Sequence, residues 1–178
     1  ASPRPDLPEV VIDPGLAFGT GSHETTRLAC GLALDALHEL RGSSRGIQKA
    51  ADIGCGTGVI AAALVRCGCP GVDACDVDAD AIEVAGEVLD VNGLLSVVNL
   101  FVGTTDVLPQ KYPLVVANIL AEKLLYIAEG IYRVTQPGGV IILSGILEAE
   151  VSEFLESFVK LCPGTLVEKE CEGDWAAL

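Results

Sequence analysis

A glycine-rich turn between a short apolar run and a helix-forming segment constrains this chain more than any other feature of its sequence. Residues 51–66 contain the run, the turn and the segment in that order, and the turn carries Gly54, Gly56 and Gly58. Glycines let the backbone bend sharply and approach a ligand closely, because no Cβ atom stands in the way. The helix that follows presents free N–H groups and the positive end of its dipole. This order of strand, tight loop and helix is typical of a site for a nucleotide-like ligand at the end of a parallel strand.

The spacing of the glycines distinguishes between the ligands that such turns bind. The dinucleotide fingerprint is G-x-G-x-x-G, and here the third glycine comes one residue early. A P-loop requires a Gly-Lys-Ser/Thr sequence, whereas Gly58 is followed by Val59. The pattern Asp-x-Gly-x-Gly-x-Gly, which starts at Asp52, resembles the first motif of class I methyltransferases that use S-adenosylmethionine (AdoMet). On this motif alone, a purely structural glycine turn in another α/β protein remains an alternative.

A second acidic residue stands near the end of the next predicted strand, residues 72–78. Asp76 lies about 20 residues beyond the glycine turn, where an acid accepts hydrogen bonds from ribose hydroxyls. Folds that bind NAD and folds that bind AdoMet both use such a carboxylate, so Asp76 indicates a ribose without choosing the cofactor. Asp78 and Asp80 are predicted to begin the following helix, where acids suit the dipole.

Composition narrows the class of protein. The 178 residues suggest one domain with a sizeable core, and no apolar run reaches the length of a membrane span. No secretory signal pattern is present, so we expect a soluble cytoplasmic protein without a membrane partner. The net charge of −14 argues against a direct nucleic-acid site, because phosphate binding requires basic patches. An acidic surface attracts a basic, lysine-bearing protein, although many soluble proteins are acidic without such a partner.

The cysteines indicate a reducing compartment. Their number, seven, is odd, and most lie within apolar patterns, which favours free thiols over a disulfide scaffold. Cys67-Gly68-Cys69 is a candidate metal or redox pair, but no histidine stands near it in the sequence. We therefore expect no metal site.

A glycine- and threonine-rich loop, residues 13–26, precedes the glycine turn. A loop of this length inside a compact domain usually has a function. It leads into a predicted helix over 26–40, for which Ser22 is the expected N-cap. His23 is a candidate catalytic base, but a structural role in shaping the loop is favoured.

The sequence of this loop, DPGLAFGTGSHETT, closely resembles the signature of the PrmA family, the bacterial ribosomal protein L11 methyltransferases. The resemblance continues through four further segments and covers nearly the whole chain from Pro8 onwards. These segments are 52–58, 76–82, 116–121 and 144–147.

The resemblance implies roles for individual residues. Thr26, Gly54, Asp76 and Asn118 match the AdoMet contacts of the family, and Asn118 is also the expected catalytic residue that orients the substrate amine. Asn118 is followed by Ile-Leu-Ala instead of the Pro-Pro-Tyr that methyltransferases of planar nitrogens often carry. This difference disfavours methylation of glutamine or of a nucleobase.

Five further residues are candidates for the cofactor site: Gly56, Gly58, Asp106, Phe18 and Thr20. In class I methyltransferases an acid after the third strand, here Asp106, often contacts the adenine amine. A solvated loop acid is the alternative for Asp106, and a core aromatic is the alternative for Phe18.

The remaining pattern predicts an α/β fold. The expected strands are 9–13, 72–78, 97–102, 114–118 and 140–144, besides the run before the glycine turn. The expected helices are 26–40, 60–66, 79–92, 121–135 and 147–161, with a break at 136–139 and a terminal hairpin formed by 165–170 and 174–178. Strands that alternate with helices favour a doubly wound parallel sheet. Together with the hairpin they match the Rossmann-like class I methyltransferase plan, a mostly parallel seven-stranded sheet with an antiparallel last strand.

The family resemblance also implies a function and a division of the chain. It implies methyl transfer from AdoMet to lysine side chains and an N-terminal α-amine of ribosomal protein L11. Residues 9–178 match only the C-terminal, catalytic part of the family, and the proline-rich residues 1–8 are expected to be the remnant of a linker to an absent substrate-recognition domain. Two alternatives stay open: a methyltransferase of the same fold that acts on another protein lysine or a small amine, and a nucleotide-binding oxidoreductase or non-catalytic AdoMet-binding scaffold.

Overall fold

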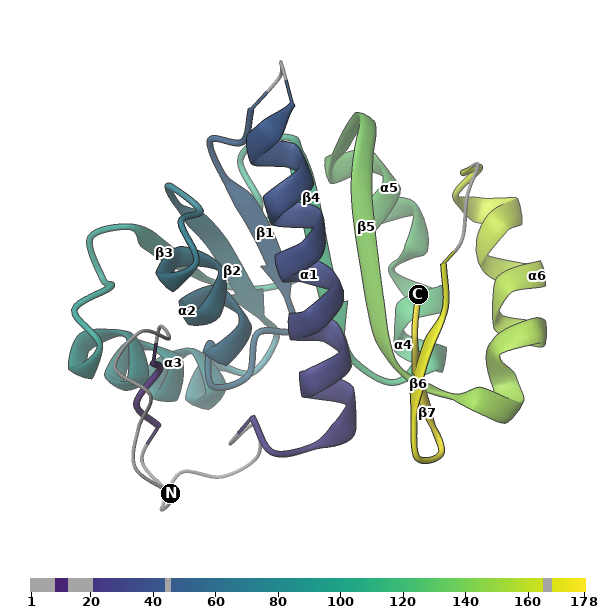
Figure 1. The fold of residues 1–178 in the computed structure, drawn as a ribbon, viewed down its shortest axis with the longest axis horizontal. Helices are drawn as coiled ribbons and strands as arrows, with labels where there is room; N and C mark the ends of the chain where they lie inside the picture. Colours follow the sequence, from purple (N-terminus) through teal and green to yellow (C-terminus); the bar gives the residue numbers. More distant parts are fainter. Residues whose placement is uncertain (1–8, 13–20, 44–45, 165–167) are drawn as a thin grey trace.

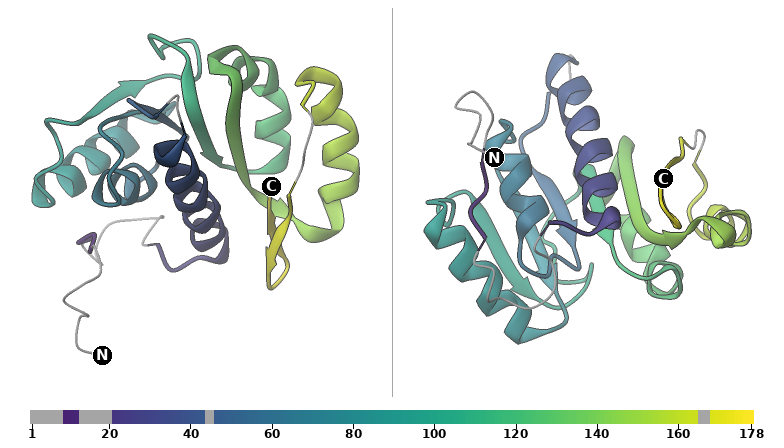
Figure 2. Two further views of the ribbon diagram at one scale, coloured as in Figure 1. Left: turned by 45° about the horizontal axis from the view of Figure 1, so that its top comes forward. Right: turned by 60° about the horizontal axis from the view of Figure 1, so that its bottom comes forward.

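A seven-stranded sheet forms the centre of the molecule, with helices on both of its faces (Figures 1 and 2). The computed structural model describes residues 9–12, 21–43, 46–164 and 168–178. The strands are β1 Ala50–Ile53, β2 Val72–Asp76, β3 Val98–Val102, β4 Tyr112–Asn118, β5 Thr135–Leu147, β6 Glu170–Glu172 and β7 Trp175–Ala177. The helices are α1 Glu24–Gly42, α2 Val59–Arg66, α3 Ala79–Val91, α4 Ala121–Tyr126, α5 Ala128–Val134, the short 3₁₀ helix η1 Glu148–Glu150, and α6 Val151–Leu161.

The strand order is β3-β2-β1-β4-β5-β7-β6. Strands β1 to β5 are parallel, β7 pairs antiparallel with β5, and β6 pairs antiparallel with β7. This topology confirms the predicted doubly wound sheet with an antiparallel last strand. The order reverses between β1 and β4, and open α/β sheets bind ligands outside the carboxyl ends of the strands at such a point.

Alternating side chains of the central strands fill two separate cores. On β4, Leu114 and Val116 pack with α1, α2 and α3, whereas Val115 and Ala117 pack with α4, α5 and α6. All four side chains are fully buried, as expected for a parallel strand covered on both faces. The two cores therefore fix the carboxyl ends of β1 and β4 from both sides.

The expected strand over residues 9–13 is wrong for the part that the structure describes. Residues 9–12 form no strand, and the backbone of Val11 is paired with the side-chain amide of Asn92 instead of with a strand. The N–H of Val11 donates to Asn92 Oδ1 at 2.9 Å, and Asn92 Nδ2 donates to the carbonyl of Val11 at 2.7 Å.

Two expectations about the second half of the chain also need correction. The predicted helix over 121–135 is two helices, α4 and α5, separated at Ile127, whose φ of −103° departs from helical geometry. The predicted break at 136–139 belongs to β5, which begins directly after α5. Strand β5 accommodates Pro137 where its register with β4 shifts, between Tyr112 and Leu114.

The end of the chain follows the prediction in outline. The helix expected over 147–161 begins one residue later, because Leu147 is still paired with Trp175 in the sheet, and it consists of η1 followed by α6. The terminal hairpin is present, with shorter strands than expected, and residues 165–167 lie outside the described part of the chain. Of the helices in the described segments, none combines the length and the hydropathy that a membrane span requires.

Candidate functional site

The glycine turn after β1 adopts a conformation that side chains would disturb. Gly54, Gly56 and Gly58 have φ values of 70°, 53° and 73°, which lie in the left-handed region. A Cβ atom at Gly54 would lie 2.4 Å from Cγ2 of Ile119, the residue that follows β4. A Cβ atom at Gly56 would meet nothing within 4 Å, so the backbone there borders open space. The turn thus combines a close approach to β4 with an open side where a ligand has room.

Asp76 lies against this turn, at the carboxyl end of β2. Its Oδ2 accepts a hydrogen bond from the N–H of Gly56 at 3.0 Å, and its Oδ1 accepts one from the N–H of Asp78 at 3.1 Å. The N–H groups of Gly54 and Cys55 donate to the carbonyl of Cys75 in the same strand. The half-buried carboxylate is therefore fixed beside the glycine turn, as an acceptor for ribose hydroxyls requires.

Asn118 and Thr26 meet on the β4 side of the turn, although 92 positions separate them in the sequence. Asn118 is the last residue of β4, and Thr26 is buried in the first turn of α1. Nδ2 of Asn118 donates to Oγ1 of Thr26 at 3.4 Å. Two residues to which the family resemblance gave the same ligand are thus in contact.

The start of α1 differs from the expectation. The N-cap is His23 and not Ser22: Nδ1 of His23 accepts a hydrogen bond from the N–H of Thr25 at 3.3 Å and lies 2.9 Å from the Thr25 hydroxyl. The imidazole also contacts the ring of Trp175 edge-on, with 5.3 Å between ring centroids. An imidazole nitrogen can thus replace the hydroxyl that usually caps a helix, and these contacts give His23 a structural role.

Asp52, at the start of the glycine motif, links the two elements that flank the glycine turn, β1 and α2. It is fully buried in β1, and its Oδ2 accepts a hydrogen bond from the N–H of Ala61 in α2 at 3.0 Å. Its Oδ1 is buried and has no hydrogen-bond partner among the described residues. Burial raises the pKa of Asp52 to about 7, against the effect of the Ala61 hydrogen bond, and the negative charge of Asp76 adds to the rise. The motif spacing alone does not predict this burial of Asp52, and the sequence signal for it is an acid within an apolar strand.

These features fit AdoMet as a ligand. The molecule carries a ribose diol, which needs an acceptor such as the half-buried carboxylate of Asp76. The open side of Gly56 gives room for close contact with the backbone. The residues able to hold the cofactor are Thr26, Gly54, Gly56, Asp76 and Asn118, with Asp52 beneath them.

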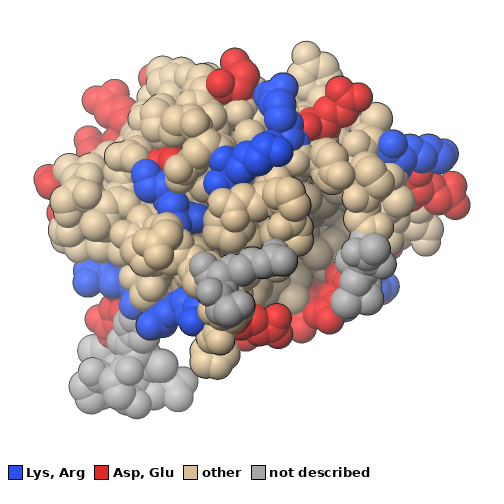
Figure 3. All heavy atoms as spheres, turned by 90° about the horizontal axis from the view of Figure 1, so that it is seen from above, with Lys and Arg blue, Asp and Glu red and all other residues tan. Residues whose placement is uncertain are grey.

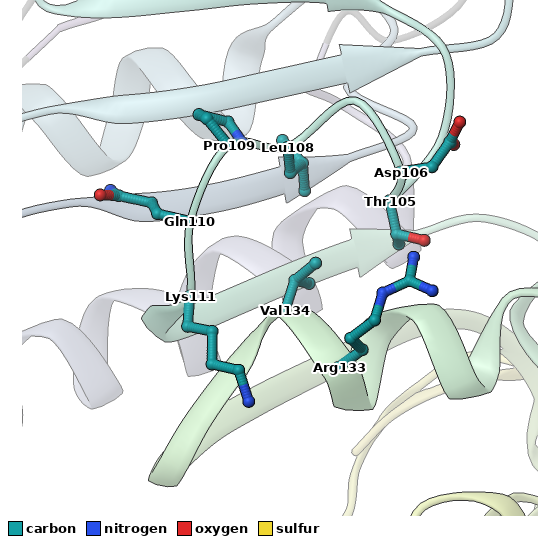
Figure 4. A pocket seen from close by; sticks show the side chains of 8 residues that line it. All are labelled: Thr105, Asp106, Leu108, Pro109, Gln110, Lys111, Arg133 and Val134. Atoms are coloured by element: carbon teal, nitrogen blue, oxygen red, sulfur yellow. The ribbon is translucent and has the colours of Figure 1, made fainter.

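The other sequence candidates lie elsewhere. Phe18 and Thr20 are outside the described residues. Asp106 is exposed, accepts a hydrogen bond from the Thr104 hydroxyl, and has a pKa lowered chiefly by that bond. It lines a hollow between the loop that precedes β4 and the end of α5, and Figure 4 shows its carboxylate at the edge of this hollow. The hollow is lined by Thr105, Asp106, Leu108, Pro109, Gln110, Lys111, Arg133 and Val134. No hydrogen bond between described residues joins Asp106 to the glycine turn.

The cysteines form no disulfide and no metal-binding group in the part of the chain that the structure describes. All seven are free, and the thiol of Cys69 donates to the carbonyl of Gly71 at 3.1 Å. Within the described segments, no group of three or more histidine, cysteine, aspartate or glutamate side chains is placed to hold a metal ion.

Charge is distributed unevenly between the two edges of the sheet. Acidic residues stand where the carboxyl ends of the strands lead into the next elements, among them Asp76, Asp78, Glu122 and Glu148. Figure 3 views the molecule from the opposite edge, where lysine and arginine side chains form a band across the middle. Cations that stand at this edge by their place in the chain are Arg41, Lys49, Lys111 and Arg133.

Comparison with known proteins identifies relatives of this chain. The family model described as ribosomal protein L11 methyltransferase (PrmA) matches residues 3–178. A ribosomal protein L11 methyltransferase of Geobacter metallireducens is 39% identical over 177 residues, which cover 99% of this chain and 56% of the relative. The corresponding protein of Geotalea uraniireducens is 37% identical over 94% of this chain and 54% of its own length.

A solved structure agrees with these sequence relatives. The crystal structure of a ribosomal protein L11 methylase from Lactobacillus delbrueckii subsp. bulgaricus superposes with a TM-score of 0.80 at 29% identity, and covers 94% of this chain and 82% of that one. The chain spans a little more than half the length of the two sequence relatives. Both the sequence and the fold therefore show that this chain belongs to the ribosomal protein L11 methyltransferase (PrmA) family.

Proposed function

We propose that this chain binds AdoMet at the carboxyl ends of β1, β2 and β4 and transfers its methyl group to amine nitrogens of ribosomal protein L11. The observation that carries the proposal is the contact between Thr26 and Asn118 beside the glycine turn. It brings the first turn of α1 to the place where strand order reverses, with the Asp76 carboxylate on the other side of the turn. The names of the relatives supply the target.

In the proposed reaction, this chain's residues bind and orient. Bound AdoMet supplies a methyl group that its sulfonium already activates. Asp76 accepts hydrogen bonds from the ribose, and the turn at Gly54 and Gly56 lets the backbone approach the cofactor. Asn118 uses Nδ2 for Thr26, and its side-chain oxygen is the acceptor that can orient an incoming N–H group.

The target amine must be neutral when it reacts. A lysine in water has a pKa of about 10.4, so it must lose a proton before it can attack. A site that excludes water favours the neutral amine, because desolvation disfavours the charged form. Positioning of the two reactants then supplies several kcal/mol of the barrier, and we assign no side chain as a general base.

We further propose that residues 9–178 form the catalytic domain, that residues 1–8 belong to a linker, and that part of target recognition lies outside the catalytic domain. The support is that the relatives are nearly twice as long as the segment they share with this chain.

The test of the proposed function is transfer of tritiated methyl from AdoMet to purified L11 and to a mixture of ribosomal proteins, resolved by gel. We expect detectable but weak label on L11, and less label with the Asn118→Ala variant. Calorimetry with AdoMet and NAD in parallel separates the alternatives. Binding of NAD without binding of AdoMet would overturn the proposal, and so would AdoMet binding without label on any ribosomal protein.

A further inference from the structure

The carboxyl ends of β4 and β5 lie side by side and hold two consecutive residues of α1. In the parallel register, Asn118 of β4 is opposite Ser144 of β5. Asn118 donates to the hydroxyl of Thr26, and Oγ of Ser144 donates to the carbonyl of Thr25 at 2.9 Å. Each strand end therefore makes one hydrogen bond to the first turn of α1.

The two strand ends are closely fitted at this point. The N–H of Ile119 donates to the carbonyl of Ser144 at 3.1 Å. Gly145 follows with a φ of 89°, and a Cβ atom there would lie 2.4 Å from the carbonyl oxygen of Ile119. This fit fixes the position of Ser144 relative to Asn118, so a residue bonded to one strand end has a defined place relative to the other.

Ser144 is placed to control the geometry of Thr26. Its side chain is fully buried, so its hydroxyl requires a hydrogen-bond acceptor within the protein. The carbonyl of Thr25 is that acceptor. By contrast, the bond from Asn118 to Thr26 is long, at 3.4 Å, and a bond of that length depends on what else holds the two residues.

The outer side of the same helix turn is attached to the terminal hairpin. Arg27 donates from Nε and Nη2 to the carboxylate of Glu172, with a shortest distance of 2.6 Å, and His23 contacts Trp175. Because the Arg27–Glu172 pair is exposed, its geometry is easily changed by solvent. Of the two hydrogen bonds that join this turn to the strand ends in the described part of the chain, the one from Ser144 is therefore the shorter and the better shielded from solvent.

We propose that Ser144 is a positioning residue, whose hydroxyl holds the first turn of α1 so that Thr26 meets Asn118 at the cofactor crevice. The proposal rests on the proposed function only for its effect on AdoMet, because the Thr26–Asn118 contact exists without the ligand.

The experiment compares Ser144→Ala with a matched control at the other end of β5. Thr135 is also buried, and its hydroxyl donates to a helix carbonyl, that of Ile131, at 2.7 Å. Thr135→Val removes an equivalent bond far from the crevice. The first measurement is the NMR signal of the Asn118 side-chain amide in the protein without ligand. We expect Ser144→Ala to shift this signal and Thr135→Val to leave it unchanged.

The second measurement is AdoMet affinity by calorimetry in a double-mutant cycle with Thr26→Val. We expect Ser144→Ala to weaken binding roughly 3- to 10-fold in the native chain, as for the loss of one hydrogen bond. In the Thr26→Val background it should add less than about twofold, because the residue through which Ser144 acts no longer offers a hydroxyl. If Ser144→Ala does not fold, Ser144→Cys, which keeps a weaker donor, should still shift the same amide signal, which Thr135→Val leaves unchanged.

The outcomes separate the two proposals. An unchanged Asn118 signal in folded Ser144→Ala, or fully additive losses of affinity, overturns the role of Ser144. A shifted signal in a chain that never binds AdoMet supports the role of Ser144 and overturns the proposed function instead.

Discussion

Asp52 has the one buried side-chain oxygen that lacks a hydrogen-bond partner among the described residues. Its folded-state pKa, raised to about 7, lies above the unfolded value of about 3.9, so the folded protein binds the proton more tightly. The stabilisation from this proton is complete below about pH 4 and is lost as the pH rises through about 7. We therefore expect Asp52 to lower the free energy of unfolding by up to about 1.4 kcal/mol per pH unit between these values.

Urea unfolding of the native chain and of Asp52→Asn at pH 5 and pH 7.5 measures this effect. Asparagine keeps an acceptor for the N–H of Ala61 but does not titrate. The variant should gain stability relative to the native chain at the higher pH. An equal difference at both pH values would show that Asp52 does not titrate in this range.

Asp76 is the residue whose loss should affect cofactor binding most. We expect Asp76→Ala to weaken AdoMet binding roughly 10- to 100-fold, because a charged acceptor to a diol contributes about 1.5–3 kcal/mol. Asp78→Ala is the matched control: it removes the N-cap of α3, which accepts from the N–H of Asp80 at 3.0 Å, but leaves the Asp76 carboxylate in place. Calorimetry that shows equal losses for the two variants would assign the effect to the α3 terminus.

Asn118 should separate binding from chemistry. If its side-chain oxygen orients the amine, Asn118→Ala lowers the rate of a single turnover more than it lowers AdoMet affinity. The measurements are rapid-quench methyl transfer at saturating AdoMet and calorimetry on the same preparation. Equal losses in both would make Asn118 a cofactor contact only.

At the scale of elements, a glycine-to-alanine substitution is expected to lower the free energy of unfolding in the glycine turn and to raise it in helix α1. Gly54→Ala places a Cβ atom 2.4 Å from the branched side chain of Ile119 at a positive φ, so we expect a loss of about 1–3 kcal/mol in the free energy of unfolding. Gly31 lies on the exposed side of α1, and a Cβ atom there meets nothing within 4 Å. Gly31→Ala should therefore add about 0.5–1 kcal/mol.

Thermal and urea unfolding of both alanine variants measure the two changes. A Gly54→Ala variant as stable as the native chain would mean that Ile119 moves aside without cost. It would remove the argument that the turn and the end of β4 are fitted to each other.

Elements governed by local rules were predictable from the sequence. The glycine turn, the strand expected over 72–78 and the helix expected over 79–92 depend on neighbouring residues and lie close to where the pattern placed them, although β2 ends two residues early, at Asp76. The early start of β5 was not predictable, because it depends on pairing with Tyr112, and neither was the pairing of Asn92 with Val11. Both corrections arise from contacts between segments far apart in the chain.

The candidate site divides in the same way. Gly54 and Asp76 follow from motif spacing, whereas Thr26 and Asn118 were identified only through the family resemblance, since nothing local shows that they touch. The bond from Ser144 to Thr25 joins residues 119 positions apart, and no periodicity or motif indicates it. The unpartnered oxygen of Asp52 likewise depends on burial, which the sequence suggests but does not quantify.

At the scale of the whole molecule, we expect the 178-residue chain to bind AdoMet with ordinary affinity but to methylate L11 poorly. Contacts remote from the reacting amine provide binding energy that is used for positioning, and by our proposal some of these contacts lie beyond this segment. The measurement is methyl transfer to purified L11 by this chain and by a version extended at its N-terminus to the length of the relatives. Equal kcat/KM values for the two would place target recognition within residues 9–178.

The opposite charges at the two edges of the sheet give the molecule an electric dipole moment. We expect the electric field of a lysine-rich target to exert a torque on this dipole before any contact forms, which turns the crevice edge towards the target and the cationic edge away. Counter-ions at physiological ionic strength limit this effect to about 8 Å, which is the range of the last step of approach. The charge distribution therefore acts on the rate of productive collisions rather than on the strength of the complex. The net charge attracts the target, and the dipole orients the chain as the two approach.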